Sequence, residues 1–301
     1  MKISAATKAY ERYRNAPALR DIHEVLTFLR ETGFEAVDLT LESIYHPEFV
    51  LSGEDWQKKV EDLGETAAKL GLEIYQCHTP YVKGCCIATC SHIKTEEDMI
   101  FFRKMLRRSI EASAMLGVKW AVYHPLTFPE LNFERMPSME ANRAFFDEFV
   151  ELGIQHGVGA AFENQLPSLD RKFPTRFGSH YEELIALADS YHDPLVGICW
   201  DTGHANQMKF HQDRAIRALG SRLKALHIND NHYGHRDEHL LPYMGEVDWE
   251  AVTRALKEEG YSGTLNYECK YTMESDGEFQ KEFVRAMYRN GELLRNMLDK
   301  K

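Results

Sequence analysis

Five segments of the chain repeat one pattern, in which an amphipathic helix ends at a glycine and a short apolar strand follows. Glycine suits the left-handed backbone conformation that ends many helices. The strands after these glycines are almost continuously apolar, as in parallel sheets that are covered on both faces. The pattern therefore predicts repeated helix–strand units with parallel strands. The five glycines are Gly33, Gly71, Gly117, Gly157 and Gly260.

The spacing of the repeat predicts eight strands in this chain of 301 residues. The first four glycines lie 38, 46 and 40 residues apart, the length of one strand–helix unit with a generous loop. Further strands are expected in 194–201, in 223–230 and in "KISAA" at the start. Eight alternating units favour a single-domain (β/α)8 TIM barrel over residues 1–301. An open doubly wound sheet is the alternative, but no glycine-rich nucleotide fingerprint accompanies it.

Capping residues predict where three helices start. Ser52, Thr95 and Asp248 each precede a helical pattern, and acidic residues follow in the first turn. The long connections, at 79–94, 125–137, 164–180 and 230–247, all follow strands. They are therefore expected at the face of the barrel where the strands end, which is where such folds carry their chemistry.

Composition limits the class of protein. Acidic residues outnumber basic ones by 47 to 36, which gives a formal charge of −11 and disfavours a general nucleic-acid binder. The first residues contain no apolar signal-peptide core, and no apolar run is long enough to span a membrane. Six cysteines are most simply free thiols in a reducing compartment. We therefore expect a cytoplasmic protein without a membrane partner.

Six consecutive predicted strands bring an acidic residue or a histidine to the same rim. Several carboxylates in one small volume repel each other, and a divalent cation relieves that repulsion. A structural ion-pair network is the alternative, but Lys270 is the one basic residue near these strand ends in sequence. An oxygen-rich set favours Mn²⁺, with Mg²⁺, Co²⁺ or Zn²⁺ as further candidates. The residues are His78, His124, Glu163, Asp201, His227 and Glu268.

Four short motifs resemble the metal-binding strands of the xylose isomerase-like superfamily. They are "AFEN" at 161–164, "WDTGHAN" at 200–206, "LHIND" at 226–230 and "NYEC" at 266–269. The resemblance implies that Glu163, Asp201, His227 and Glu268 bind the metal. It also implies that Glu163 and Glu268 are catalytic and move protons, and that His204 contacts the substrate.

The resemblance implies an isomerase or epimerase that acts on a sugar, keto-sugar or sugar phosphate. We expect one glutamate to take the proton beside a carbonyl and the other to return it, through a metal-stabilised enediolate. A lyase or dehydratase on a keto-sugar needs the same first step. One departure is visible: keto-sugar epimerases carry an arginine shortly after the strand-7 histidine, whereas this chain has "HINDNHYGHRD" with Arg236 further on. The family allows a homo-oligomer.

The same superfamily contains the endonuclease IV class of abasic-site nucleases, which hold three zinc ions. Their additional ligands would correspond to His78, His124, His204, Asp237 and His239. This chain therefore has a residue of the required type at every ligand position of that class. Sugar-acting relatives keep several of these residues, and we expect them to line the substrate pocket instead. For His78 and His124 a role as hydrogen-bonded rim residues is the alternative, and for His204 it is a helix cap.

Three further features carry weaker expectations. The loop "KGCCIATCSH" at 83–92 lacks the usual spacing of a zinc site and is expected to be a lid or subunit contact. Arg171, Lys172 and Arg176 form either a lid that meets an acidic sugar or a solvated loop. Tyr81 and Trp200 are candidates for stacking on a sugar ring.

Overall fold

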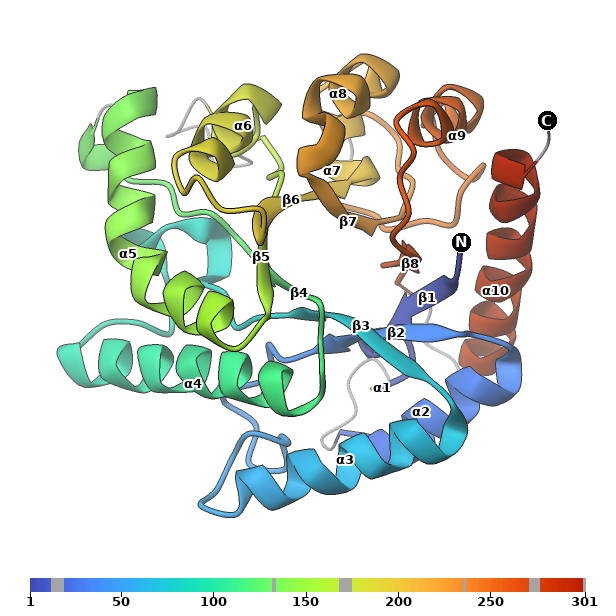
Figure 1. The fold of residues 1–301 in the computed structure, drawn as a ribbon, viewed down its shortest axis with the longest axis horizontal. Helices are drawn as coiled ribbons and strands as arrows, with labels where there is room; N and C mark the ends of the chain where they lie inside the picture. Colours follow the sequence, from blue (N-terminus) through green and yellow to red (C-terminus); the bar gives the residue numbers. More distant parts are fainter. Residues whose placement is uncertain (12–18, 132–133, 168–174, 235–236, 271–276, 300–301) are drawn as a thin grey trace.

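Eight parallel strands form the centre of the computed structural model, which describes residues 1–11, 19–131, 134–167, 175–234, 237–270 and 277–299 (Figure 1). Hydrogen-bonded neighbours follow the order β7-β6-β5-β4-β3-β2-β1-β8. A parallel bridge between Ile228 and Tyr267 joins the two ends of this sheet. The predicted (β/α)8 barrel is confirmed. The strands are β1 Ile3–Ala6, β2 Ala36–Thr40, β3 Glu73–His78, β4 Trp120–Tyr123, β5 Gly159–Glu163, β6 Val196–Asp201, β7 Leu223–His227 and β8 Leu265–Tyr267.

Helices surround the strands on the outside of the barrel (Figure 1). All five repeat glycines have positive φ, and Gly33 and Gly71 end α2 and α3 as predicted. At Gly33 a Cβ would also lie 2.6 Å from the Tyr288 ring, so only glycine fits there. The helices are α1 Lys8–Glu11, α2 Ile22–Thr32, α3 Trp56–Leu70, α4 Glu96–Met115, α5 Arg135–Gln155, α6 Tyr181–Asp189, α7 Thr202–Gln207, α8 Gln212–Leu219, α9 Trp249–Glu258 and α10 Gly277–Asp299.

Two of the three predicted helix starts are confirmed. Thr95 forms a capping box with Asp98 at the start of α4, and the Asp248 side chain accepts from the backbone N–H of Ala251 in α9. The start at Ser52 is wrong, because α3 begins at Trp56. The Ser52 backbone N–H and hydroxyl donate to carbonyls of the preceding turn, so this residue completes a loop and caps no helix.

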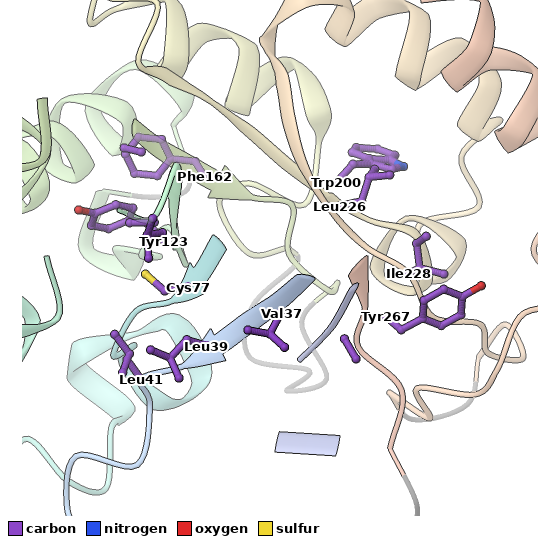
Figure 2. Close-up of a cluster of buried hydrophobic side chains, with 14 of the residues drawn as sticks. Val37, Leu39, Leu41, Cys77, Tyr123, Phe162, Trp200, Leu226, Ile228 and Tyr267 are labelled. Carbon is purple, nitrogen blue, oxygen red and sulfur yellow. The ribbon is translucent and has the colours of Figure 1, made fainter. Parts of the chain in front are cut away.

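The two faces of the strands differ in character. Side chains that face the helices are large and apolar; Figure 2 shows part of this cluster, including Tyr123, Phe162 and Trp200. A separate, small apolar cluster comes from alternate positions of β4 to β7: Val122, Ala161, Cys199 and Ala225. Polar residues at alternate positions of the other strands hydrogen-bond across the interior. Successive side chains of a strand point alternately outward and inward, and in this barrel the inward positions carry small or polar residues.

The position of Trp200 contradicts its predicted stacking role. Its indole Nε1 donates to Gln212 Oε1 at 3.1 Å, and its ring lies near Phe210 and Tyr181, which belong to the outer layer. Trp200 is therefore a core residue between β6 and the helices. Among the described residues, no helix is both long and apolar enough to cross a membrane.

Candidate metal centre

The four predicted metal ligands lie at the ends of four successive strands and converge. Glu163, Asp201 and His227 are the last residues of β5, β6 and β7, and Glu268 directly follows β8. One potential ligand atom from each lies within 4.8 Å of the others. All four residues are almost completely buried. The parallel register thus concentrates three carboxylates and one imidazole in one small volume.

His227 lies between the two glutamates. Its Nδ1 is 3.0 Å from Glu163 Oε1 and 3.0 Å from Glu268 Oε2. Among the described residues, none of these three atoms has a well-directed hydrogen bond, although all are buried. Burying such atoms without satisfying them is costly. A divalent cation shared by these atoms would remove that cost, so the residues present fit a metal ion.

The charges in the cluster oppose the effect of burial on the two glutamates. Burial favours the neutral acid, but the imidazoles of His227 and His124 hold the pKa of Glu163 well below its usual range. Burial also raises the pKa of Glu268, but the nearby Lys8 and His227 outweigh this effect and hold that pKa well below its usual range. Burial raises the pKa of Asp201, which His204 only partly offsets. Both glutamates are therefore ionised, as metal ligands must be.

A second group of three potential ligands shares Glu163 with the first. Its members are His78, His124 and Glu163. His124 Nε2 lies 2.8 Å from Glu163 Oε2 and 2.7 Å from His78 Nε2. The Tyr81 ring stacks on His124 at a centroid distance of 4.4 Å, so Tyr81 borders this group. Its predicted stacking on a sugar ring stays a prediction.

His204, Asp237 and His239 lie on the other side of the centre. His204 Nδ1 is 2.7 Å from the Asn164 carbonyl oxygen, and its Nε2 is 3.9 Å from Asp237 Oδ1. His239 Nε2 lies 2.5 Å from Asp237 Oδ2. The His204 ring caps no helix; Asp201 does so, accepting from the His204 backbone N–H at 2.7 Å. The structure thus brings all five predicted substrate-contacting residues to the rim of the metal cluster.

A model of the xylose isomerase-like TIM barrel family matches residues 26–287. This chain belongs to that family. A match at 33% identity to a probable endonuclease 4 of Methanosphaera stadtmanae covers 27% of this chain and 34% of that protein. Two further curated relatives are uncharacterised proteins of Sinorhizobium fredii and Methanocaldococcus jannaschii, each 28% identical. The matches cover 61% and 60% of this chain and 58% and 62% of those proteins.

Solved structures of the xylose isomerase-like fold superpose along the whole chain. The D-psicose 3-epimerase of Clostridium cellulolyticum H10, solved with D-tagatose, is 15% identical with a TM-score of 0.75 and covers 100% of both chains. The IolI protein with a bound zinc atom is 17% identical with a TM-score of 0.72, covering 99% of this chain and 98% of its own. At such identity these likenesses show the shared fold.

The sequence analysis of this xylose isomerase-like barrel missed two charged residues at the centre. Lys8 forms an ion pair with Glu268 Oε1 and lies 3.9 Å from Glu42 Oε1. Lys270, the basic residue considered instead, contacts Asp237 at 3.4 Å. Lys8 lies two residues after the end of the first strand. This position at the strand-end rim could have identified it as a residue of the centre. The second missed residue is Asp38, an acidic side chain inside the apolar strand "AVDLT".

The cysteine-rich loop packs beside the second ligand group. Cys85 Sγ lies 2.9 Å from Gln165 Oε1 and 3.7 Å from His124 Nδ1. All six cysteines are unpaired, as expected. Within the described part of the chain, no potential metal group includes a cysteine. Of the predicted basic lid, Arg171 and Lys172 lie outside the described residues, as does Arg236.

Proposed function

We propose that this family member is a divalent-metal-dependent isomerase or epimerase that acts on a sugar or keto-sugar. The observation that carries the proposal is the convergence of Glu163, Asp201, His227 and Glu268 in one small volume. Glu163, His227 and Glu268 contribute buried ligand atoms that lack a well-directed hydrogen bond. The solved relatives with this fold include sugar epimerases, which supports the substrate class. The unpaired cysteines support a reducing compartment such as the cytoplasm.

Glu163, Asp201, His227 and Glu268 would hold the ion. Three carboxylates and one imidazole suit Mn²⁺ best, with Mg²⁺, Co²⁺ and Zn²⁺ as alternatives. The ion would supply positive charge beside the substrate oxygens, which makes the neighbouring C–H group more acidic.

The two glutamates are placed to exchange a proton with the substrate. Each directs one carboxylate oxygen to His227 Nδ1, and each has a second oxygen held by a basic group, His124 for Glu163 and Lys8 for Glu268. One glutamate takes the proton from the carbon beside the carbonyl, and the other returns a proton to the other face or to the neighbouring carbon. The same removal step would serve a lyase or dehydratase.

The imidazole of His204 would orient the substrate. Its Nδ1 is held by the Asn164 carbonyl oxygen, so its Nε2 is the atom directed toward the rim, beside Asp237. Asp237 and His239 form a fixed pair, since His239 Nδ1 also lies 2.6 Å from the Glu268 carbonyl oxygen. These groups can donate to and accept from sugar hydroxyls without leaving their places.

The first test is metal content, followed by proton exchange. Elemental analysis of the purified protein should give one equivalent of manganese, magnesium or cobalt per chain. Keto-sugars should then exchange a carbon-bound proton with deuterated solvent in the presence of the enzyme. Glu163→Gln and Glu268→Gln should each remove that exchange while the fold is kept. Glu65→Gln, on the exposed face of α3, is the matched control and should retain it. Full exchange in Glu268→Gln would disprove the catalytic assignment.

A second candidate function is a multi-zinc phosphodiesterase that acts at abasic DNA. The observation that favours it is the second ligand group, His78, His124 and Glu163, beside the first. The chain's net charge of −11 disfavours it, because DNA is bound mainly through its phosphates. Two or three zinc ions per chain, with cleavage of an abasic oligonucleotide, would establish this function in place of the first.

A further inference from the structure

Asp38 lies in the middle of β2, buried inside the barrel below the metal cluster. Its side chain is fully buried, and none of the ion pairs of the described residues joins it to a lysine or arginine. Its Oδ2 accepts from Gln76 Nε2 at 3.2 Å and from Asn266 Nδ2 at 3.1 Å. The same oxygen lies 3.2 Å from His227 Nε2. Three nitrogen atoms from three different strands therefore converge on one carboxylate oxygen.

The surrounding contacts determine which atoms face Asp38. The Ser4 hydroxyl donates to Asn266 Oδ1 at 2.8 Å, so the amide nitrogen of Asn266 must face the carboxylate. His227 turns Nε2 toward Asp38 and Nδ1 toward Glu163 and Glu268. A metal ion held by the two glutamates would take the Nδ1 lone pair, which leaves Nε2 as the ring nitrogen that carries the proton and can donate to Asp38.

We propose that Asp38 is a positioning residue that fixes His227 with its proton on Nε2 and its Nδ1 lone pair directed into the metal centre. This inference rests on the proposed metal centre. Histidines that bind metals commonly donate their other ring N–H to a carboxylate, which sets the ring orientation and strengthens the ligand. In this structure His227 Nε2 lies 3.2 Å from Asp38 Oδ2, but the contact is not a well-directed hydrogen bond. A metal ion bound to Nδ1 would hold the opposite side of the imidazole ring and so favour alignment of Nε2 with Asp38.

Packing does not require a charged residue at this level of the barrel. The other half of the interior is filled by Val122, Ala161, Cys199 and Ala225, all small and apolar. A buried carboxylate without a lysine or arginine partner is costly, and apolar residues of similar volume would fill the same space more easily. The polar arrangement around Asp38 is explained by what it does for His227.

The test compares Asp38→Asn with Gln76→Met. The first keeps the shape of the side chain and removes its charge. The second removes another hydrogen bond to the same oxygen and leaves the His227 contact in place. Affinity for Mn²⁺ alone is measured by competition with a fluorescent chelator. Asp38→Asn should weaken it by about 10- to 100-fold, whereas Gln76→Met should change it by less than threefold. Far-UV circular dichroism checks that both variants fold.

A second measurement needs no variant of Asp38. Two-dimensional ¹H–¹⁵N NMR of the histidine rings in the wild type saturated with Zn²⁺, which is diamagnetic, reports which nitrogen of His227 carries the proton, with the signal assigned by its loss in His227→Gln. We expect a protonated Nε2. A His227 ring protonated on Nδ1 alone would overturn the inference, even where Asp38→Asn fails to fold.

The outcomes separate this inference from the proposed metal centre. Wild type that binds Mn²⁺ together with an Asp38→Asn variant that binds it equally well would overturn the role of Asp38 and leave the centre intact. Wild type that binds no divalent metal would overturn both. An equal fall in Mn²⁺ affinity in Asp38→Asn and Gln76→Met would indicate a general disturbance of packing. That result would also reject a specific role of Asp38 in positioning His227.

Discussion

At the scale of single residues, every proposed ligand of the metal centre has an outer partner. At least one polar atom of each side chain contacts a neighbour that is not itself a proposed ligand. A cation would therefore find the ligands already oriented, which reduces the entropy lost on binding. The pairs are Glu163 with His124, Asp201 with Asn229, His227 with Asp38 and Glu268 with Lys8.

Replacing Lys8 should reveal how much the Glu268 ion pair stabilises the protein. Lys8→Met leaves a buried carboxylate without its cation, and we expect the metal-free protein to lose about 2 kcal/mol of unfolding free energy. Saturating Mn²⁺ should restore part of this loss, because the metal takes over the neutralisation of Glu268. Urea denaturation with and without Mn²⁺ measures both effects.

Lys2→Met is the matched control for the Lys8 experiment. Lys2 also pairs with a glutamate, Glu73, but both side chains are substantially exposed. Exposed pairs contribute at most about 1 kcal/mol, so this variant should be nearly neutral and insensitive to Mn²⁺. Equal losses in the two variants would contradict a special role for the Lys8–Glu268 pair.

The predictability of the site differs from residue to residue for a physical reason. Glu163 and Asp201 could be placed from the sequence because each is an acidic residue at the end of an apolar strand, where burial without a partner is costly. Lys8 was missed because its partner lies 260 residues away, and only closure of the barrel brings β1 beside β8. Asp38 was missed because its partners Gln76, His227 and Asn266 come from three other strands, which no pattern within its own strand displays.

At the scale of elements, Asp201 ends one element and begins the next. It is the last residue of β6, and its Oδ1 accepts from the His204 backbone N–H at the start of α7. Its Oδ2 accepts from Asn229 Nδ2 at 2.8 Å, which connects it to the segment after β7. The short helix α7 is therefore anchored by a proposed metal ligand, and the two depend on each other.

Gly203 in α7 makes this close arrangement achievable. A Cβ at this position would lie 1.9 Å from Asn229 Oδ1, so Gly203→Ala should displace Asn229 from Asp201. We expect a loss of about 1–3 kcal/mol in unfolding free energy and weaker Mn²⁺ binding. Gly64→Ala, inside α3, is the control: a Cβ there meets only the end of the Leu116 side chain, and alanine favours helix. Stability unchanged in Gly203→Ala would contradict the steric argument.

Helix boundaries were predictable where a side chain alone determines them. Thr95 and Asp248 cap helices through contacts within three residues, which sequence displays directly. Ser52 is likewise a capping-type residue before a helical pattern, yet its hydroxyl donates to the His46 carbonyl oxygen in the preceding loop. Whether a serine caps a helix or forms a hydrogen bond within a turn depends on the path of the loop. That path cannot be predicted from the neighbouring residues alone.

At the scale of the whole molecule, the barrel interior is divided by chemistry. Small apolar side chains fill the half under β4 to β7, and polar groups fill the half under β1, β2, β3 and β8. The eight-strand architecture followed from the glycine-marked repeat, since that pattern recurs along the whole chain. The polar half did not follow, because its hydrogen bonds join strands that are far apart in sequence.

Metal binding should stabilise the entire barrel, because four strands end at the centre. An ion present at 100 times its dissociation constant contributes about 2.7 kcal/mol, which corresponds to a rise in Tm of roughly 4 °C for a chain of this size. Differential scanning fluorimetry with Mn²⁺ and with EDTA measures the difference.

Asp201→Asn separates specific from nonspecific stabilisation by the metal. Asparagine caps helices as well as aspartate does, so α7 should keep its start while the centre loses a charged ligand. The rise in Tm with Mn²⁺ should therefore become much smaller in this variant. An undiminished rise would place the stabilising ion elsewhere on the molecule.

The distribution of the proposed ligands along the chain also has a consequence in time. Glu163, Asp201 and His227 come from three successive strands, but the fourth ligand follows β8, the last strand of the chain to be synthesised. A growing polypeptide would offer a divalent ion only three of the four proposed ligands until β8 emerges and pairs with β1. The complete proposed centre would therefore form only when the barrel closes.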